Sequence, residues 1–306
     1  MFVGHETLAF ALVALAALRL GRSKPEALAL GVAAGAFAAV PDVDMVYAPA
    51  GLLGLDSAGA FAAANAFWGA STVVHRAMTH SLVVAVPAAL GFALAAHDSR
   101  ARWLAAPVLL ALVGVAAVAS GPLGAFVMAV YVAAGALVAV LASRRLALGV
   151  REVAAVALAG LVTHPFGDLF TGEAPQFLYP FHTLVFDGRV ALAADPTLHL
   201  LGAFGVELAA IWLGVLTYLH LTDRSPWRHL NVRAAGGAAY ALAAFVIAPP
   251  TLDTSYQFVF SVLAVGFVGV VPDWERRLPA PPTAAVTGLA AVTVAGLAYA
   301  IAYVAA

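Results

Sequence analysis

Four short clusters of histidines and carboxylates interrupt a chain that is otherwise rich in Ala, Val and Leu. In chain order they are Gly4-His5-Glu6, Pro41-Asp42-Val43-Asp44, His75-Arg-Ala-Met-Thr-His-Ser81 and His164-Pro-Phe-Gly-Asp168. Ionisable groups at the edges of long apolar runs cost free energy and mark functional sites by default. Imidazoles together with carboxylates are the ligands that Zn²⁺ and related divalent ions take in proteins. The four clusters therefore predict a metal site.

The spacing within each cluster decides which side chains can reach one ion. His164 and Asp168 are four residues apart, so on a helix they lie one turn apart on the same face. Asp42 and Asp44 follow Pro41, and both reach one site only if the chain turns there, because in an extended segment they point apart. The alternatives are a helix end with an incidental polar pair and a solvated pair of loop carboxylates.

His75 and His80 are five residues apart, so they do not share a helix face. A turn that leads into a helix beginning at Thr79–Ser81 would bring the two rings together. Thr79 or Ser81 could equally serve only as the N-cap of that helix.

Three further charged residues are candidates for the site. Arg76 suits forked recognition of a phosphate or carboxylate, unless it forms a salt bridge with one of the aspartates that follow Pro41. Glu6 stands at an expected helix start, where it is either a capping carboxylate or a general base. Glu207 lies inside an apolar run, where an unpaired charge is expensive, so we expect it to support the site or to face the substrate.

The composition places these clusters in a membrane protein. Of the 306 residues 63% are hydrophobic and only 10% are charged, and the mean hydropathy is +0.97. Apolar runs such as 103–119 and 122–142 match the roughly 20 residues that cross a bilayer core. Because the backbone must satisfy its own hydrogen bonds in lipid, these runs predict helices and an all-α, polytopic membrane protein.

Two compositional facts exclude other classes. The chain has no cysteine, so disulfides and thiolate ligands are excluded. Its net charge of −1, without a basic stripe, argues against a nucleic-acid partner.

The distribution of Lys and Arg predicts the topology. We expect both termini outside, an interfacial or re-entrant helix at 56–74, and about ten membrane-spanning helices at residues 6–20, 27–40, 81–97, 103–119, 122–142, 153–170, 198–220, 234–248, 255–271 and 283–304. Thirteen of the fifteen basic residues are then cytoplasmic, and only Arg76 and Arg189 lie outside. The same layout places all four clusters on the outer side of the cell membrane at similar depth, which supports one shared extracytoplasmic site.

These motifs, in this order, resemble the YdjM-type family of LexA-regulated, membrane-bound, metal-dependent hydrolases. The resemblance covers residues 1–207 and is carried by the four clusters, by the continuation of the last one to Thr171, and by Leu178-Tyr-Pro180. Residues 208–306 add helices without a motif of this family. Where the family pattern often continues Pro-Asp-x-Asp with His, this sequence has Met45. The family is in turn distantly similar to zinc-dependent phospholipase C and P1-type nucleases, which act on phosphoesters.

The resemblance implies which residues form the site. They are His5, Asp42, Asp44, His75, His80, His164 and Asp168. Seven ligands exceed the need of one tetrahedral ion, which favours two ions or supporting roles for some members. We also expect Thr79, Ser81, Thr171 and Glu207 to support the site or to face the substrate.

We therefore expect a hydrolase with one or two divalent ions, and we expect these ions to be Zn²⁺. It would act at the outer membrane face on a phosphoester of a lipid or lipid-linked substrate, with membrane lipid as its partner. The ion would activate a water molecule, Asp44 or Glu6 would take its proton, and Arg76 would hold an anionic oxygen.

The alternative from another class is a transporter or channel that uses the same His and Asp residues as an ion or proton path. A transporter should place its ionisable groups near the bilayer midplane and show a repeat between its halves. Here the groups lie at one edge, and the sequence shows no evident repeat. A third possibility is a degenerate structural homologue, to which Met45 lends some support.

Overall fold

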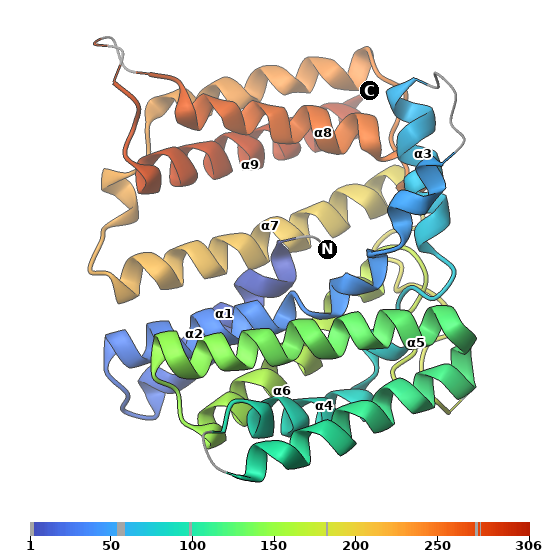
Figure 1. Cartoon of the computed structure of the whole chain (residues 1–306). Helices are drawn as coiled ribbons and strands as arrows, with labels where there is room; N and C mark the ends of the chain where they lie inside the picture. Colours follow the sequence, from blue (N-terminus) through green and yellow to red (C-terminus); the bar gives the residue numbers. More distant parts are fainter. Residues whose placement is uncertain (1–2, 54–58, 98–99, 182, 273–274, 276) are drawn as a thin grey trace. The chain divides into compact units, whose positions relative to one another are not determined.

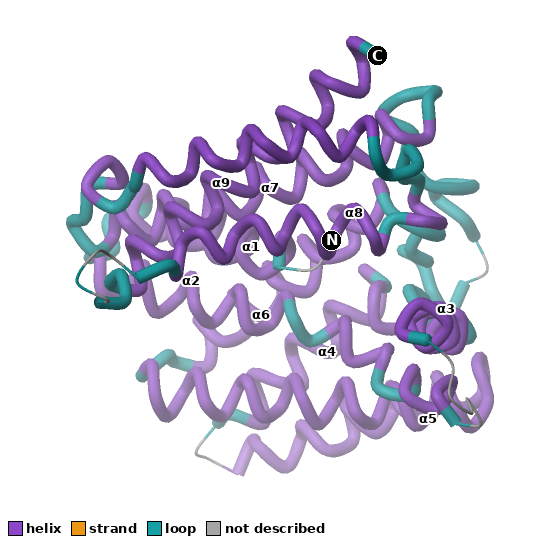
Figure 2. Tube along the Cα trace, turned by 90° about the horizontal axis from the view of Figure 1, so that it is seen from above, coloured by secondary structure: helices purple, strands orange, loops and turns teal. Residues whose placement is uncertain are grey.

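The computed structural model describes residues 3–53, 59–97, 100–181, 183–272, 275 and 277–306. Every regular element within these residues is helical, and no strand occurs among them, as Figure 2 shows along the Cα trace. This confirms the predicted all-α fold. Contacts divide the chain into a larger unit, Leu8–Leu169 with Glu173–Arg189, and a smaller unit, Met1–Thr7 with Phe170–Gly172 and Val190–Ala306.

The predicted apolar segments are helical at nearly the expected positions. The larger unit contains most of α1 (Gly4–Arg19), then α2 (Lys24–Ala38), η1 (Pro41–Met45), η2 (Ala48–Leu52), α3 (Ala60–Ser71), η3 (Met78–His80), α4 (Leu82–Ala95), η4 (Arg100–Leu104), α5 (Ala105–Leu146) and α6 (Val150–Gly167), and the short η5 (Asp168–Phe170) follows. The smaller unit contains α7 (Pro196–Leu221), η6 (Pro226–Arg228), η7 (Val232–Phe245), η8 (Leu252–Thr254), α8 (Tyr256–Ala264), η9 (Val265–Val270) and α9 (Pro281–Ala305). The elements labelled η are 3₁₀ helices.

The long α5 contains two of the predicted helices. Gly121 breaks it with a φ of 69° and a ψ of −164°, a conformation that a residue without Cβ adopts readily. Pro122 then begins the second half, a position that suits proline because its missing N–H is not needed there. Figure 1 shows the chain turning back at this point, so the two halves form a helical hairpin.

Among the described residues, five helical segments are long and apolar enough to cross a bilayer. They are Lys24–Leu52, Arg102–Leu146, Val150–Phe170, Pro196–Leu221 and Pro281–Ala305. Three shorter apolar helices accompany them, at Leu82–Ala95, Val232–Phe245 and Tyr256–Val270. These helices confirm a helical membrane protein. The count of ten spans, the outward termini and the interfacial position of 56–74 stay predictions. Residues 56–58 of that last segment lie outside the described ones.

A close approach of α6 to α2 shapes the interior of the larger unit. Gly160 on α6 faces α2 so closely that a methyl group in its place would lie 2.5 Å from the carbonyl oxygen of Ala34 and 2.8 Å from the amide nitrogen of Ala38. The last turn of α6 therefore lies beside the C-terminal end of α2, from which the chain enters η1.

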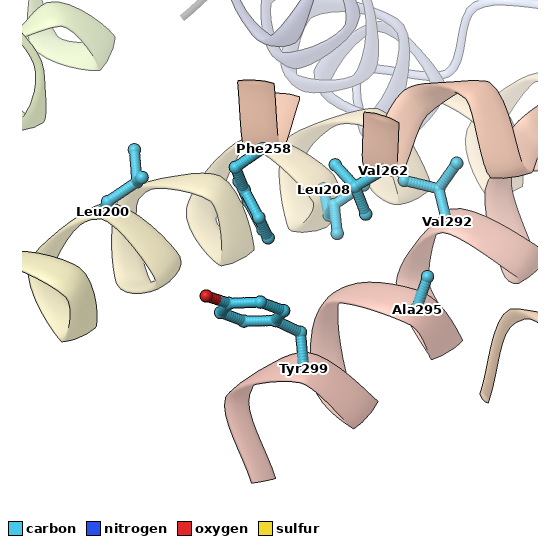
Figure 3. Packing of buried hydrophobic residues seen from close by; sticks show 7 residues of the cluster. All are labelled: Leu200, Leu208, Phe258, Val262, Val292, Ala295 and Tyr299. Atoms are coloured by element: carbon cyan, nitrogen blue, oxygen red, sulfur yellow. The ribbon is translucent and has the colours of Figure 1, made fainter. Parts of the chain in front are cut away.

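The smaller unit has its own hydrophobic core between α7, α8 and α9. Figure 3 shows the rings of Phe258 and Tyr299 facing each other there, together with Leu208, Val262 and Val292. The two ring centroids lie 5.1 Å apart in an edge-to-face arrangement, which aromatic pairs favour.

Candidate metal centre

Three parts of the larger unit bring polar side chains together. The 3₁₀ helix η1 carries Asp42 and Asp44, and it is the turn after Pro41 that these two aspartates need in order to reach one site. The turn that ends in η3 carries His75 and His80. The last turn of α6 carries His164, and Asp168 follows it directly.

Side-chain atoms of Asp42, His80 and Asp168 lie around the Nε2 atom of His164. The Nε2 atom of His164 lies 3.0 Å from His80 Nε2, 3.5 Å from Asp42 Oδ1 and 3.7 Å from Asp168 Oδ2. His80 Nε2 lies 3.0 Å from the same Asp168 oxygen. A tetrahedral zinc ion with ligands at about 2.0–2.1 Å places its ligand atoms about 3.3 Å apart, so the spacing of His80, His164 and Asp168 fits one ion.

Hydrogen bonds at the opposite nitrogens fix how the two imidazoles face this point. His164 Nδ1 lies 2.6 Å from the carbonyl oxygen of Ala38, which can only accept, so Nδ1 carries the hydrogen. The hydroxyl of Thr79 donates to Asp44 Oδ2 at 3.0 Å and therefore accepts from His80 Nδ1 at 2.9 Å. In both rings the Nε2 atom consequently faces the other ring and the Asp168 carboxylate.

This arrangement suits a cation. Two nitrogen lone pairs and a carboxylate oxygen within 3.0–3.7 Å of one another repel when nothing positive lies between them. His80, His164 and Asp168 are buried, so water screens this repulsion poorly. The side chain of Asp42 is 38% exposed, and the cluster reaches the surface there.

Asp44 and His75 lie behind the converging atoms. Asp44 Oδ1 accepts from His75 Nδ1 at 3.0 Å, and Asp44 Oδ2 accepts from the backbone N–H of Arg76 and from Thr79, each at 3.0 Å. The other ring nitrogen of His75 accepts from Arg76 Nε at 3.1 Å. The structure thus places these two predicted ligands where they orient His80 and Arg76.

The guanidinium of Arg76 is bound to the segment that follows α6. Its Nη2 donates to Asp168 Oδ1 at 3.1 Å, and its Nη1 donates to the carbonyl oxygens of Asp168 at 3.2 Å and Glu173 at 2.9 Å. From the sequence we considered a salt bridge of Arg76 with an aspartate that follows Pro41. The structure instead shows a salt bridge of Arg76 with Asp168. Arg76 has a φ of 57°, uncommon for a residue with a Cβ, and its guanidinium fixes one oxygen of Asp168 so that the other faces the cluster.

Ser81 is the N-cap of α4, as one of the two sequence interpretations held. Its hydroxyl oxygen accepts from the N–H groups of Val83 at 3.1 Å and Val84 at 3.3 Å. The same hydroxyl donates to the carbonyl oxygen of Tyr179 at 2.8 Å. Ser81 thus joins the histidine segment to the loop of residues 173–189.

The remaining predicted residues belong to the smaller unit, and their roles stay predictions. His5 and Glu6 stand in the first turn of α1, Thr171 follows η5, and Glu207 lies on α7. Within this unit the carboxylates of Glu6 and Glu207 are close enough to interact electrostatically.

Sequence reasoning missed the backbone carbonyls that complete the centre. The carbonyl of Ala38 sets the orientation of His164, and that of Glu173 helps to hold Arg76. A carbonyl oxygen carries no side-chain identity, so no pattern of residue types indicates it.

Helices that can span a bilayer, with two imidazoles and two carboxylates gathered among them, define an integral membrane protein with a candidate metal centre. The chain belongs to the YdjM inner membrane protein family, whose family model matches residues 1–230. This match confirms the resemblance and extends past residue 207. Comparisons with curated proteins and with solved structures gave no match. The similarity to phospholipase C and P1 nucleases stays a prediction.

Proposed function

We propose that this protein is a membrane-embedded hydrolase that uses a divalent ion at the centre formed by His80, His164 and Asp168. Zinc is the ion that we expect there. The observation that carries the proposal is the pair of inward-facing Nε2 lone pairs beside a carboxylate oxygen. Each ring is held by an acceptor at its other nitrogen, which is how proteins orient histidine ligands of metals. Imidazole and carboxylate groups suit zinc, and the chain offers no thiolate.

In this proposal Asp42 is a general base and not a metal ligand. Catalytic zinc sites have three protein ligands and an open fourth position, whereas closed four-ligand sites are structural. The three buried residues supply three ligands, and the exposed carboxylate of Asp42 stands at the open side. There it can accept the proton of the attacking water. Asp44 is less suited to that step, because three donors already occupy its oxygens.

The substrate proposal is a phosphoester of a lipid or lipid-linked molecule on the extracytoplasmic side. A bound divalent ion supplies Lewis acidity and makes water a stronger nucleophile near neutral pH. The family resemblance suggests the phosphoester, and the charge asymmetry of the loops supports the outward face. Arg76 holds Asp168 in place while the substrate approaches from the side of Asp42.

Metal analysis of the purified protein, combined with a substrate panel, tests this function. We expect about one equivalent of zinc or a similar ion in the wild type, almost none in His164→Ala, and the wild-type amount in His220→Ala. His220 is the matched control because it is an exposed histidine near the end of α7. A metal-loaded wild type that cleaves no phosphoester, amide or carboxyl ester, yet moves protons or ions in liposomes, would establish the transporter alternative instead.

A further inference from the structure

The loop of residues 173–189, in the larger unit, exposes several large apolar side chains. Phe181, Leu184, Val185 and Phe186 are 64%, 59%, 52% and 36% exposed. All four lie outside helices. Exposed apolar residues on a membrane-spanning helix face hydrocarbon, but a group of them on a loop indicates a binding surface.

The first half of this loop is fixed to the segment that carries His80. The N–H of Gln176 donates to the carbonyl oxygen of Arg76 at 2.9 Å, and the N–H of Leu82 donates to that of Phe177 at 2.9 Å. The hydroxyl of Tyr179 shares a hydrogen bond of 3.1 Å with Ser120 at the break of α5. The loop therefore has a defined position relative to the metal centre.

A row of aromatic rings leads from the metal centre to the exposed part of the loop. Phe166 lies between His164 and Asp168 in the sequence, at the end of α6, and is 45% exposed. Its ring centroid lies 5.2 Å from that of Phe177, which is buried, and Phe177 lies 5.8 Å from Phe186. The three rings thus connect the last turn of α6 to the loop.

The backbone of the loop indicates its depth. Irregular backbone exposes N–H and C=O groups that hydrocarbon cannot satisfy, so such a loop stays at the membrane–water boundary unless protein covers it. Backbone bonds tie this loop to the segment that carries His80, and a divalent ion bound at that centre would attract an anion. An amphiphile with an anionic head and a hydrocarbon tail matches both features, and the membrane supplies phospholipids of this kind.

We propose that Phe166, Phe181, Leu184, Val185 and Phe186 form an acyl-chain patch that binds the hydrocarbon tail of a phospholipid whose phosphate group lies at the metal centre. This inference rests on the proposed function, since it assigns the tail-binding surface of that substrate class. The tail leaves the bilayer interior and lies along the loop, while the buried Phe177 supports the patch from beneath.

Photolabelling tests the position of the tail without requiring turnover. The zinc-loaded protein in lipid nanodiscs is irradiated with phosphatidylglycerol that carries a diazirine at the end of one acyl chain, and adducts are mapped by mass spectrometry. Chain ends of free bilayer lipids lie near the bilayer centre, where they label spanning helices. Adducts on the peptides of residues 173–189 and on Phe166 are expected only when a tail rests on the patch.

Two matched double variants make the experiment specific. Leu184→Gln with Val185→Gln removes apolar surface from the patch and should lower labelling of the Phe166 peptide at least fivefold, with the zinc content unchanged. Leu52→Gln with Leu53→Gln changes two adjacent exposed leucines, 41% and 82% exposed, at the end of η2 and should leave the labelling unchanged. Labelling confined to spanning helices, or equal labelling of Phe166 in both variants, would overturn the inference.

The outcome also separates the patch from the proposed function. Labelled patch residues in a protein that cleaves no phosphoester would support tail binding and contradict hydrolysis. Phosphoester cleavage without labelling of the patch would support hydrolysis and contradict tail binding.

Discussion

The Nε2 atoms of His80 and His164 face each other at 3.0 Å, and each ring is held by a hydrogen bond at its other nitrogen. A change of tautomer would cost His164 its bond to Ala38, and in His80 it would make the Thr79 hydroxyl donate to the ring and give up its bond to Asp44. A cation between the two rings would replace the repulsion of their Nε2 lone pairs by attraction. Metal binding to His80 and His164 should therefore stabilise the fold.

Zinc should therefore stabilise the wild type against thermal unfolding. At a free ion concentration of 100 times Kd, the gain in free energy of unfolding is about 2.7 kcal/mol. His80→Ala and His164→Ala should abolish the increase in Tm, and His220→Ala should retain it. The measurement is a thermal scan of the detergent-solubilised protein with and without zinc. An equal increase in all four proteins would place the ion elsewhere.

Asp42→Asn distinguishes a ligand from a base. If the exposed Asp42 accepts the proton of water, the variant should retain zinc and lose about 10²–10⁴-fold in turnover, the usual contribution of a general base. Zinc content and phosphoester turnover are measured on the same preparation. Loss of zinc together with activity would instead make Asp42 a fourth ligand.

Arg76→Lys should weaken metal binding. Lysine keeps the positive charge but loses the planar fork that reaches Asp168 and the carbonyl of Glu173. Loss of a group that orients a ligand costs about 10–100-fold in metal affinity. Titration with a competing zinc chelator measures this change, and Arg22→Lys is the control, because the Arg22–Glu152 ion pair is exposed and should matter little. Unchanged zinc affinity with lower turnover would favour the direct contact of Arg76 with an anionic substrate.

Gly160→Ala should separate α2 from α6. The added methyl group would meet the backbone of α2 at 2.5 Å, so the helices must move apart, at a cost of about 1–3 kcal/mol. The same movement lengthens the bond from His164 to Ala38 and should lower zinc affinity. Gly114→Ala on α5 is the control, since a methyl group there has open space. Stability is followed by denaturant unfolding in detergent, and equal stability of the two variants would contradict the close packing.

The topology is tested by placing short tags along the chain. Tags at both termini should be accessible from outside intact cells, and a tag near Arg145 should be protected, because the basic residues mark the cytoplasmic loops. Protection of both termini would invert the layout and move the centre to the cytoplasmic face.

The sequence by itself determined the helical membrane fold. Apolar runs of about 20 residues can cross a bilayer only as helices, so composition and length were enough to locate the helical segments. It also determined the residue types of the centre, because histidines and aspartates are conspicuous among Ala, Val and Leu. The sequence left the turn after Pro41 open, because a solvated pair of loop carboxylates was the alternative.

Only the tertiary structure decided which of these residues face one another. Asp44 and His75 have the same residue types as Asp168 and His80, yet they lie behind the converging atoms because the close packing of α6 on α2 and the left-handed turn at Arg76 direct them there. The role of a histidine depends on which of its two nitrogens meets an acceptor, and for His164 that acceptor is a backbone carbonyl. Such a contact depends on packing between distant segments, and the order of residue types along the chain does not encode it locally.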